Sequence, residues 1–304
     1  MDAFAAFQQM LILVLVMAVG FVIRRLKVLD EIANAYLTKL LLRVTLPATL
    51  ISGIAESTVE VPPRELVFLF AINILCFVVM ALFSLGTPLV LRTERDERGV
   101  YAAMALFGNV SFMGLPLTYA FFGPDGIFYA VVHNIVFNIL IFTLGMKLIA
   151  GTKAKLSLDF FFSPILLAAV SALLLFLLDI QLPYVMSRSL RLIGNVSTPA
   201  AMLLLGSILG AMHFREMFRG WRIYAVTFVR LVALPLVVFL LLTPFTLPPL
   251  FPEVMLMMVA SPVAISSITF SIYYGVHQEA VGKGIFVSTL LSVVTIPVLL
   301  SLLF

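Results

Sequence analysis

Long apolar segments alternate with short polar loops along the entire chain. Each segment is about as long as the roughly 20 residues with which an α-helix crosses the hydrocarbon core of a bilayer. We expect spans at about residues 4–23, 32–55, 66–91, 100–122, 127–150, 160–178, 190–212, 223–242, 254–274 and 280–303. The pattern therefore predicts an all-α integral membrane protein with ten transmembrane helices and no soluble domain between them.

Two of these spans, the fourth and the ninth, contain runs of residues that interrupt a helix. The run in span four is Gly-Asn-Val-Ser-Phe-Met-Gly-Leu-Pro at residues 108–116, and the run in span nine is Ala-Ser-Pro-Val-Ala-Ile-Ser-Ser at residues 260–267. Glycine and proline unwind helices, and each freed backbone group costs several kcal/mol in lipid unless protein or trapped water satisfies it. Broken spans in corresponding places of two halves are typical of a transporter with a binding site at the membrane midplane.

The composition agrees with a bilayer environment and excludes several classes of protein. Hydrophobic residues make up 62% of the chain and charged residues 11%, against about 45–50% and 25% in soluble domains. The single cysteine, Cys76, excludes an intrachain disulfide. The chain contains no zinc-protease motif, no intramembrane aspartate pair and no phosphate-binding glycine loop. We therefore predict a protein that is not an enzyme and that needs no metal and no cofactor.

Basic residues in the loops predict the orientation in the membrane. Most lysines and arginines follow spans one, three, five, seven and nine, so these loops are expected in the cytoplasm. Both termini then lie on the non-cytoplasmic side of the plasma (inner) membrane. The first basic residue is Arg24, so the first apolar segment is interpreted as a retained span rather than a cleaved signal peptide. The net charge of +4 lies in these loops and does not indicate a nucleic-acid partner.

An internal repeat relates the two halves of the chain. A shift of half the 304 residues aligns Pro47 with Pro199 and Gly123 with Gly275, and it places the first helix interruption on the second. Each half, residues 1–152 and 153–304, holds five predicted spans. Because five is an odd number, the halves must cross the membrane in opposite orientations. The sequence therefore predicts two inverted five-helix repeats, the architecture of many secondary transporters.

The interruption in span four also carries a family resemblance. Asn-Val-Ser-Phe-Met-Gly-Leu-Pro at residues 109–116, followed by residues 119–123, resembles the fourth-helix motif of the auxin efflux carrier family. Pro262 resembles the proline of the family's second crossover. The resemblance extends over the whole chain in span count, length and repeat position. The chain departs from plant members at Gly108, where they have proline, and at Val263 and Ala264, which replace a Gln-Gly pair.

The long hydrophilic loop of many plant members is also absent between spans five and six. Auxin itself is therefore not implied. Bacterial relatives are described as permeases for small carboxylates such as malonate and malate, which suits this compact chain better.

The resemblance implies a division of labour among the spans. Spans one, two, six and seven would form a scaffold, with a homodimer interface through spans two and seven. Spans three to five and eight to ten would form a moving transport domain of the elevator type. Spans four and nine would cross at their unwound points and bind substrate there. Pro47 and Pro199 would kink the scaffold helices that face the site.

The chemistry of broken helices predicts a site for a small organic anion. A half-helix N-terminus presents free N–H groups and a positive dipole end, which favour a carboxylate. The candidate substrate-binding residues are Asn109, Ser111, Gly114, Pro116, Ser261, Pro262, Ser266 and Ser267 at the interruptions, and Asn134, Asn138 and Asn195 in spans five and seven. The alternative is that these polar side chains only bridge helices, at about 0.6 kcal/mol each.

Charged residues inside apolar segments are further candidates. Arg230 in span eight and His133 in span five are candidates for an electrostatic or proton role. For both, the alternative is a structural role, which for His133 is a hydrogen-bonded histidine. Lys39 and Arg43 lie near the cytoplasmic end of span two, where they attract substrate or extend to the interface as snorkelling anchors.

The absence of acidic residues near the interruptions bears on energy coupling. Every Asp and Glu lies in a loop or at the end of a predicted span, so neither a carboxylate proton relay nor a charged sodium site is visible. This favours an anion carrier driven by the membrane potential, which is worth about 2.3 kcal/mol per charge per 100 mV and expels anions from an inside-negative cell. The alternatives are a sodium-coupled organic anion symporter of the bile-acid carrier type, an organic-acid channel, and a membrane-embedded sensor.

Overall fold

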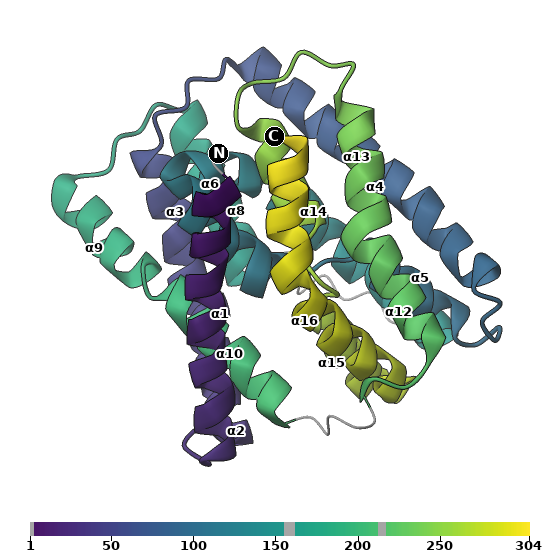
Figure 1. Ribbon diagram of the computed structural model, residues 1–304. Coiled ribbons are helices and arrows are strands. Elements are labelled where there is room, and N and C mark those ends of the chain that lie inside the picture. The colour runs from purple at the N-terminus through teal and green to yellow at the C-terminus, as the bar shows by residue number, and fades with distance from the viewer. Residues whose placement is uncertain (1–2, 155–161, 212–216) are drawn as a thin grey trace. The chain divides into compact units, whose positions relative to one another are not determined.

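The computed structural model describes residues 3–154, 162–211 and 217–304, and helices dominate this part of the chain (Figure 1). Seven helical stretches are long and apolar enough to cross a membrane by length and composition. They are Phe7–Arg25, Glu31–Glu56, Pro63–Val90, Val110–Lys153, Tyr184–Ala211, Trp221–Leu242 and Gln278–Leu303. The prediction of an all-α membrane protein is confirmed at this level.

The predicted number of ten spans differs from seven because some predicted spans are joined and others are short. Val110–Lys153 has 44 residues, which as one ideal helix would be about 66 Å long, twice the hydrocarbon core. Gly123, with φ 62°, breaks the helical geometry within it. Helix α8 (Pro164–Leu177) has 14 residues, and both interrupted spans consist of shorter pieces. Residues 160, 161 and 212, at the ends of predicted spans six and seven, lie outside the described residues.

The chain packs into two units, each built from stretches that are distant in sequence. The first unit comprises the described residues of 1–69, 111–135 and 158–212. The second comprises the described residues of 70–110, 136–157 and 213–304. Both interrupted spans contribute to the second unit, and the first interrupted span continues into the first unit at Ser111.

Helices α1 and α10 form the most closely packed pair of the first unit. The unit contains α1 (Ala3–Arg25), α2 (Glu31–Leu40), the π-helical turn η1 (Leu41–Thr45), α3 (Leu46–Glu56), α8, α9 (Tyr184–Gly194), α10 (Ser197–Ala211) and the start of α6 (Leu115–Leu140). The purple α1 runs beside the green α10, and α3 packs against α8 and α9 (Figure 1).

Glycines allow the backbones of α1 and α10 to touch. A Cβ atom at Gly206 would overlap the carbonyl oxygen of Met17, and one at Gly20 would overlap the carbonyl oxygen of Leu203. A Cβ at Gly210 would lie 3.0 Å from the carbonyl oxygen of Phe21. Such small-residue contacts stabilise helix pairs in lipid because close packing replaces the missing hydrophobic driving force.

The second unit is built around two short helices that are buried on every side. These are α5 (Arg98–Leu106) and α14 (Phe251–Val259), in which every residue from 100 to 106 and from 254 to 259 is buried. Around them lie most of α4 (Pro63–Val90), the end of α6, η3 (Ile141–Gly145), α7 (Met146–Ala150), η4 (Gly151–Lys153), α12 (Trp221–Phe228), η6 (Val229–Ala233), α13 (Leu234–Leu242), α15 (Ile265–Tyr274) and α16 (Gln278–Leu303). All-round burial is typical of helices at the centre of a bundle.

The close approach of α1 and α10 makes a direct prediction. Gly206→Ala should lower the thermal unfolding midpoint of the purified protein, because the added methyl forces the two backbones apart at a cost of about 1–3 kcal/mol. Gly86→Ala on α4 is the matched control, since a Cβ there meets nothing within 4 Å, and alanine favours a helix by up to about 1 kcal/mol. Equal midpoints for the two variants would contradict the contact.

Candidate functional site

The two predicted helix interruptions meet in the second unit. Helix α5 ends at Leu106 and is followed by extended backbone at Phe107, whereas α14 ends at Val259 and is followed by a turn at Ala260. Gly108 and Val263 form an antiparallel β-bridge. The N–H of Asn109 donates to the carbonyl oxygen of Pro262 at 2.6 Å, and the N–H of Ala264 donates to that of Phe107 at 3.0 Å. The prediction that both spans are broken is confirmed, and the broken segments pair with each other.

This pairing satisfies backbone groups that helix breaks release in a buried place. Asn109, Ser261, Val263 and Ala264 are all almost fully buried. The N–H of Val263 has no place in the pairing and instead donates to the hydroxyl of Ser288 on α16 at 3.0 Å. An unsatisfied buried N–H costs about 1–3 kcal/mol. Ser288 therefore stabilises the paired segments by accepting this hydrogen bond.

Arg230 joins the ends of the two short helices. Its side chain is 2% exposed and comes from the π-helical turn η6. Nε donates to the carbonyl oxygen of Ser261 at 2.9 Å, and Nη2 donates to that of Val259 at 2.6 Å. Nη1 donates to the carbonyl oxygens of Ala105 at 3.2 Å and Leu106 at 2.9 Å. The guanidinium therefore binds the last carbonyls of both α5 and α14, where the helix dipoles are negative.

Gly108 provides the space for this guanidinium. A Cβ atom at position 108 would overlap Nη2 of Arg230 and would lie 3.1 Å from the carbonyl oxygen of Ser261. The glycine that looked like a departure from the plant pattern is thus required by the arginine.

In the first unit, the continuation of span four contacts the break between α9 and α10. The hydroxyl of Tyr119 donates to Oδ1 of Asn195 at 2.9 Å, and the hydroxyl of Thr198 donates to the carbonyl oxygen of Pro116 at 3.4 Å. Asn195 is exposed and lies immediately after α9. Two predicted site residues, Asn195 and Pro116, therefore form hydrogen bonds with Tyr119 and Thr198, respectively.

A hydrogen bond also joins the two proline-containing spans of this unit. Thr49 donates to the carbonyl oxygen of Gly194 at 3.0 Å and lies 2.8 Å from the hydroxyl of Ser197. Pro47 lies just after the π-helical turn η1, and Pro199 lies in the first turn of α10. Both prolines accompany irregular backbone, and the hydroxyl pair connects these two places.

A family model described as "Membrane transport protein" matches residues 5–159 and 153–300. The chain belongs to this family, the auxin efflux carrier family. Family membership makes the protein a multi-pass membrane transporter and implies a non-enzymatic carrier.

Curated relatives match the transporter over nearly their whole lengths. It is similar to the uncharacterized transporter MJ1031 of Methanocaldococcus jannaschii, with 23% identity over 297 residues that cover 94% of this chain and 95% of that protein. It is also similar to the uncharacterized transporter YfdV of Escherichia coli K12, with 24% identity over 302 residues that cover 94% of this chain and 93% of that protein.

The remaining predicted site residues of the transporter fall in both units. In the second unit, the hydroxyl of Ser261 donates to the carbonyl oxygen of Met257 at 3.2 Å, so it is satisfied within its own chain segment. Ser266 is half-buried. Ser267 is fully buried, and its hydroxyl has no hydrogen-bond partner within the described part of the chain. Ser271, one turn further along α15, has the same property and was missed by the sequence analysis.

The predicted site residues of α6 are buried, whereas the two basic residues of span two are exposed. His133, Asn134 and Asn138 lie on α6 and are buried, as is Gly114 in η2 (Val110–Gly114), while Ser111 at the start of that turn is half-buried. Lys39 and Arg43 are exposed, and Nζ of Lys39 lies 5.5 Å from the centre of the Tyr36 ring. Their exposure agrees with the snorkelling alternative. Among the described residues, no group of three or more His, Cys, Asp or Glu side chains is placed to hold a metal.

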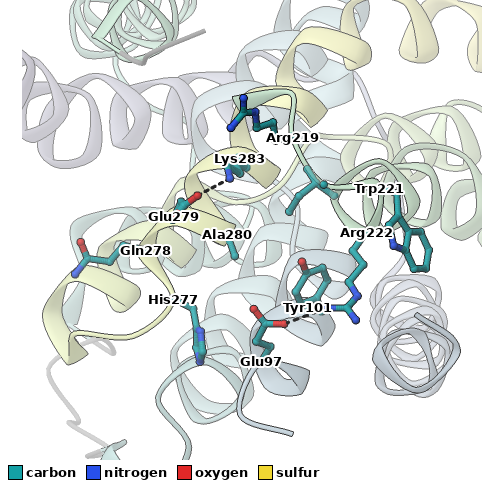
Figure 2. Close-up of a pocket in the computed structure, with 12 residues that line it drawn as sticks. Glu97, Tyr101, Arg219, Trp221, Arg222, His277, Gln278, Glu279, Ala280 and Lys283 are labelled. Carbon is teal, nitrogen blue, oxygen red and sulfur yellow. Dashed lines mark hydrogen bonds and ion pairs between the residues drawn. The ribbon is translucent and has the colours of Figure 1, made fainter. Parts of the chain in front are cut away.

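A cavity of about 500 Å³ lies at the opposite end of α5 (Figure 2). It is lined at the starts of α5, α12 and α16 by charged residues, including Glu97, Arg222 and Lys283. Arg222 pairs with Glu97 at 3.8 Å, and Lys283 pairs with Glu279, as Figure 2 shows. Such partly exposed pairs contribute up to about 1 kcal/mol each. We interpret this cavity as a place where one ion pair joins the starts of α5 and α12 and another lies within the first turns of α16, and not as the substrate site.

The contact between Gly108 and Arg230 makes a second prediction. Gly108→Ala should lower the thermal unfolding midpoint of the purified transporter, because the methyl group displaces the guanidinium from its carbonyls. The loss in the free energy of unfolding should be at least as large as the roughly 1–3 kcal/mol that overpacking typically costs. Gly282→Ala on α16 is the control, because a Cβ there meets nothing within 4 Å. A Gly108→Ala variant as stable as the control would show that Arg230 is not confined there.

Proposed function

We propose that this transporter is a secondary or potential-driven carrier of small organic anions such as carboxylates. The observation that carries the proposal is the asymmetry of charge at the crossover, which is the place where residues 107–109 pair with residues 262–264. Arg230 neutralises the carbonyl ends of α5 and α14, whereas the N-terminus of α15 has no side-chain cap. An uncapped N-terminus presents N–H groups and a positive dipole end, which attract a carboxylate.

Buried hydroxyls add neutral donors to this positive end. Ser267 lies in the first turn of α15, and Ser271 follows one turn later. Burying a hydroxyl without a hydrogen-bond partner costs free energy. A bound solute with oxygen atoms would remove this cost by accepting a hydrogen bond from the hydroxyl. We propose that Asn109, Ser261, Pro262, Ser266 and Ser267, which all lie in the second unit, contribute to the substrate site. The binding roles of Ser111, Gly114, Pro116, Asn134, Asn138 and Asn195 stay predictions from the sequence.

We further propose that the carrier has ten spans in two inverted repeats, residues 1–152 and 153–304, and moves by an elevator mechanism. The support is that the described residues of predicted spans one, two, six and seven all fall in one packing unit. Residues 111–135 pack with that unit too. The proposed homodimer would use spans two and seven, where Val44 and Val196 are exposed apolar residues at positions related by the repeat.

Export is the proposed direction, from a plasma membrane with both termini outside the cytoplasm. Among the described residues, no Asp or Glu is buried, so no buried carboxylate is present there to couple transport to protons. Without coupling, an inside-negative potential drives anions outward.

Ligand binding tests the substrate class. A panel of mono- and dicarboxylates, including malonate and malate, should contain at least one that raises the unfolding midpoint of the wild type, because a ligand at 100 times its Kd adds about 2.7 kcal/mol of stability. Asn109→Ala should abolish this shift while leaving expression intact. Asn34→Ala on α2 is the matched control and should respond as the wild type does.

Two results would contradict this proposal. One is that no carboxylate shifts the wild type at either of two pH values, with or without sodium. The other is that Asn109→Ala responds as strongly as Asn34→Ala. For a carboxylate that binds, saturable counterflow in proteoliposomes distinguishes a carrier from a channel.

A further inference from the structure

The partners of Arg230 are unusual for a buried charge. Its four hydrogen bonds all go to backbone carbonyl oxygens. Within residues 3–154, 162–211 and 217–304, no carboxylate forms an ion pair with it. Buried charges are normally paired with opposite charges, because desolvation is otherwise too costly. Here the compensating negative charge comes from the carbonyl ends of two helices, since each helix C-terminus carries about half a negative charge.

A cluster of carbonyl oxygens from helix ends and unwound backbone is a site for a monovalent cation. Membrane transporters bind their coupling ions in this way at broken helices, and carbonyl oxygens replace the hydration shell of ions in channels. Ala105, Leu106, Val259 and Ser261 supply such a cluster from both interrupted spans. The guanidinium of Arg230 occupies its centre.

The local backbone directs Arg230 into this position. Arg230 lies in a π-helical turn, and Pro235 follows in the first turn of α13. Proline has no N–H to donate to the carbonyl of the residue four positions earlier, so regular helix is weakened here. Single π-helical turns occur frequently at functional sites. Gly108 has no Cβ atom, and a Cβ there would overlap the guanidinium.

We propose that Arg230 is a tethered cation, which permanently fills a monovalent-cation site formed by the carbonyl ends of α5 and α14. The proposal rests on the carrier function proposed above and specifies its coupling: a free sodium ion has no place at this cluster, so sodium is not needed to hold the two half-helices together. Removing the side chain should convert the cluster into an open site that accepts a free cation of suitable shape, guanidinium first.

Chemical rescue tests this proposal without any substrate. Purified wild type, Arg230→Ala and Arg222→Ala are compared by thermal unfolding in low-millimolar guanidinium, sodium, potassium or choline chloride at constant ionic strength. Arg222 is the matched control because it lies on the same span, in α12, but is only half-buried and pairs with the carboxylate of Glu97, with a single further hydrogen bond to the carbonyl oxygen of Arg92. Arg230→Ala should lower the midpoint by about 5 °C or more, and guanidinium should restore at least half of that loss.

Sodium should be a weaker substitute than guanidinium, and choline should have no effect because it is too large. Selective rescue of Arg230→Ala supports the proposal. Rescue by choline to the same extent, equal responses of Arg222→Ala or the wild type, or no rescue by any of these cations would overturn it. Because no carboxylate is present, a failure here is distinct from a failure of the ligand-binding test.

A second pair of variants covers the case in which Arg230→Ala cannot be purified. Arg230→Lys keeps the positive charge, and Arg230→Met has similar bulk without it. Heat-induced aggregation of tagged protein in membranes ranks them without purification. A tethered cation predicts that the lysine variant survives to a higher temperature than the methionine variant. A methionine variant as stable as the lysine variant would overturn the proposal, since the cluster would then need only volume.

Discussion

Every peptide group that a broken helix releases inside a membrane needs a partner from the protein, and this requirement organises the second unit. The two extended segments satisfy part of it reciprocally, through the bonds of Asn109 to Pro262 and of Ala264 to Phe107. Ser288 accepts the N–H that the pairing leaves over. Arg230 takes up the carbonyls at both helix ends. Helices α5 and α14 can therefore end in a dry interior, where water is not available to solvate them.

The same arrangement separates charge along the crossover. The negative ends of the two half-helices face a fixed positive group, so their dipoles are largely compensated. The N-terminal end of α15 has no side-chain cap and keeps its positive potential. In the function proposed above, this end would attract an anion through amides and hydroxyls without a cationic side chain directly on it. Release of the proposed substrate would then require only that water replaces a few neutral hydrogen bonds, which would suit a carrier that unloads its substrate in every cycle.

The sequence predicted the breaks because glycine, proline and polar residues are conspicuous in an apolar segment. It could not predict the partners of Arg230, since backbone carbonyls have no residue-specific signal, and the structural and electrostatic alternatives stayed equally open. The contact between Thr49 and Ser197 joins residues 148 positions apart, a relation that local patterns do not contain. Ser271 was overlooked because a single serine in a helix is unremarkable until its burial is known. Ten spans were expected where seven helical stretches are long enough to cross, because Val110–Lys153 continues across the turn at Gly123 and because α8 and the pieces of span nine are short.

The overlap between a Cβ at position 108 and the guanidinium of Arg230 makes the two residues mutually dependent. A chain with proline at the first position cannot place an arginine in this way, and has to compensate its helix ends by another route, such as an acidic residue with a bound ion or a lysine from a different span. A relative with any side chain at the first position is therefore expected to lack an arginine confined at the second, and the residues at these two positions can be read together.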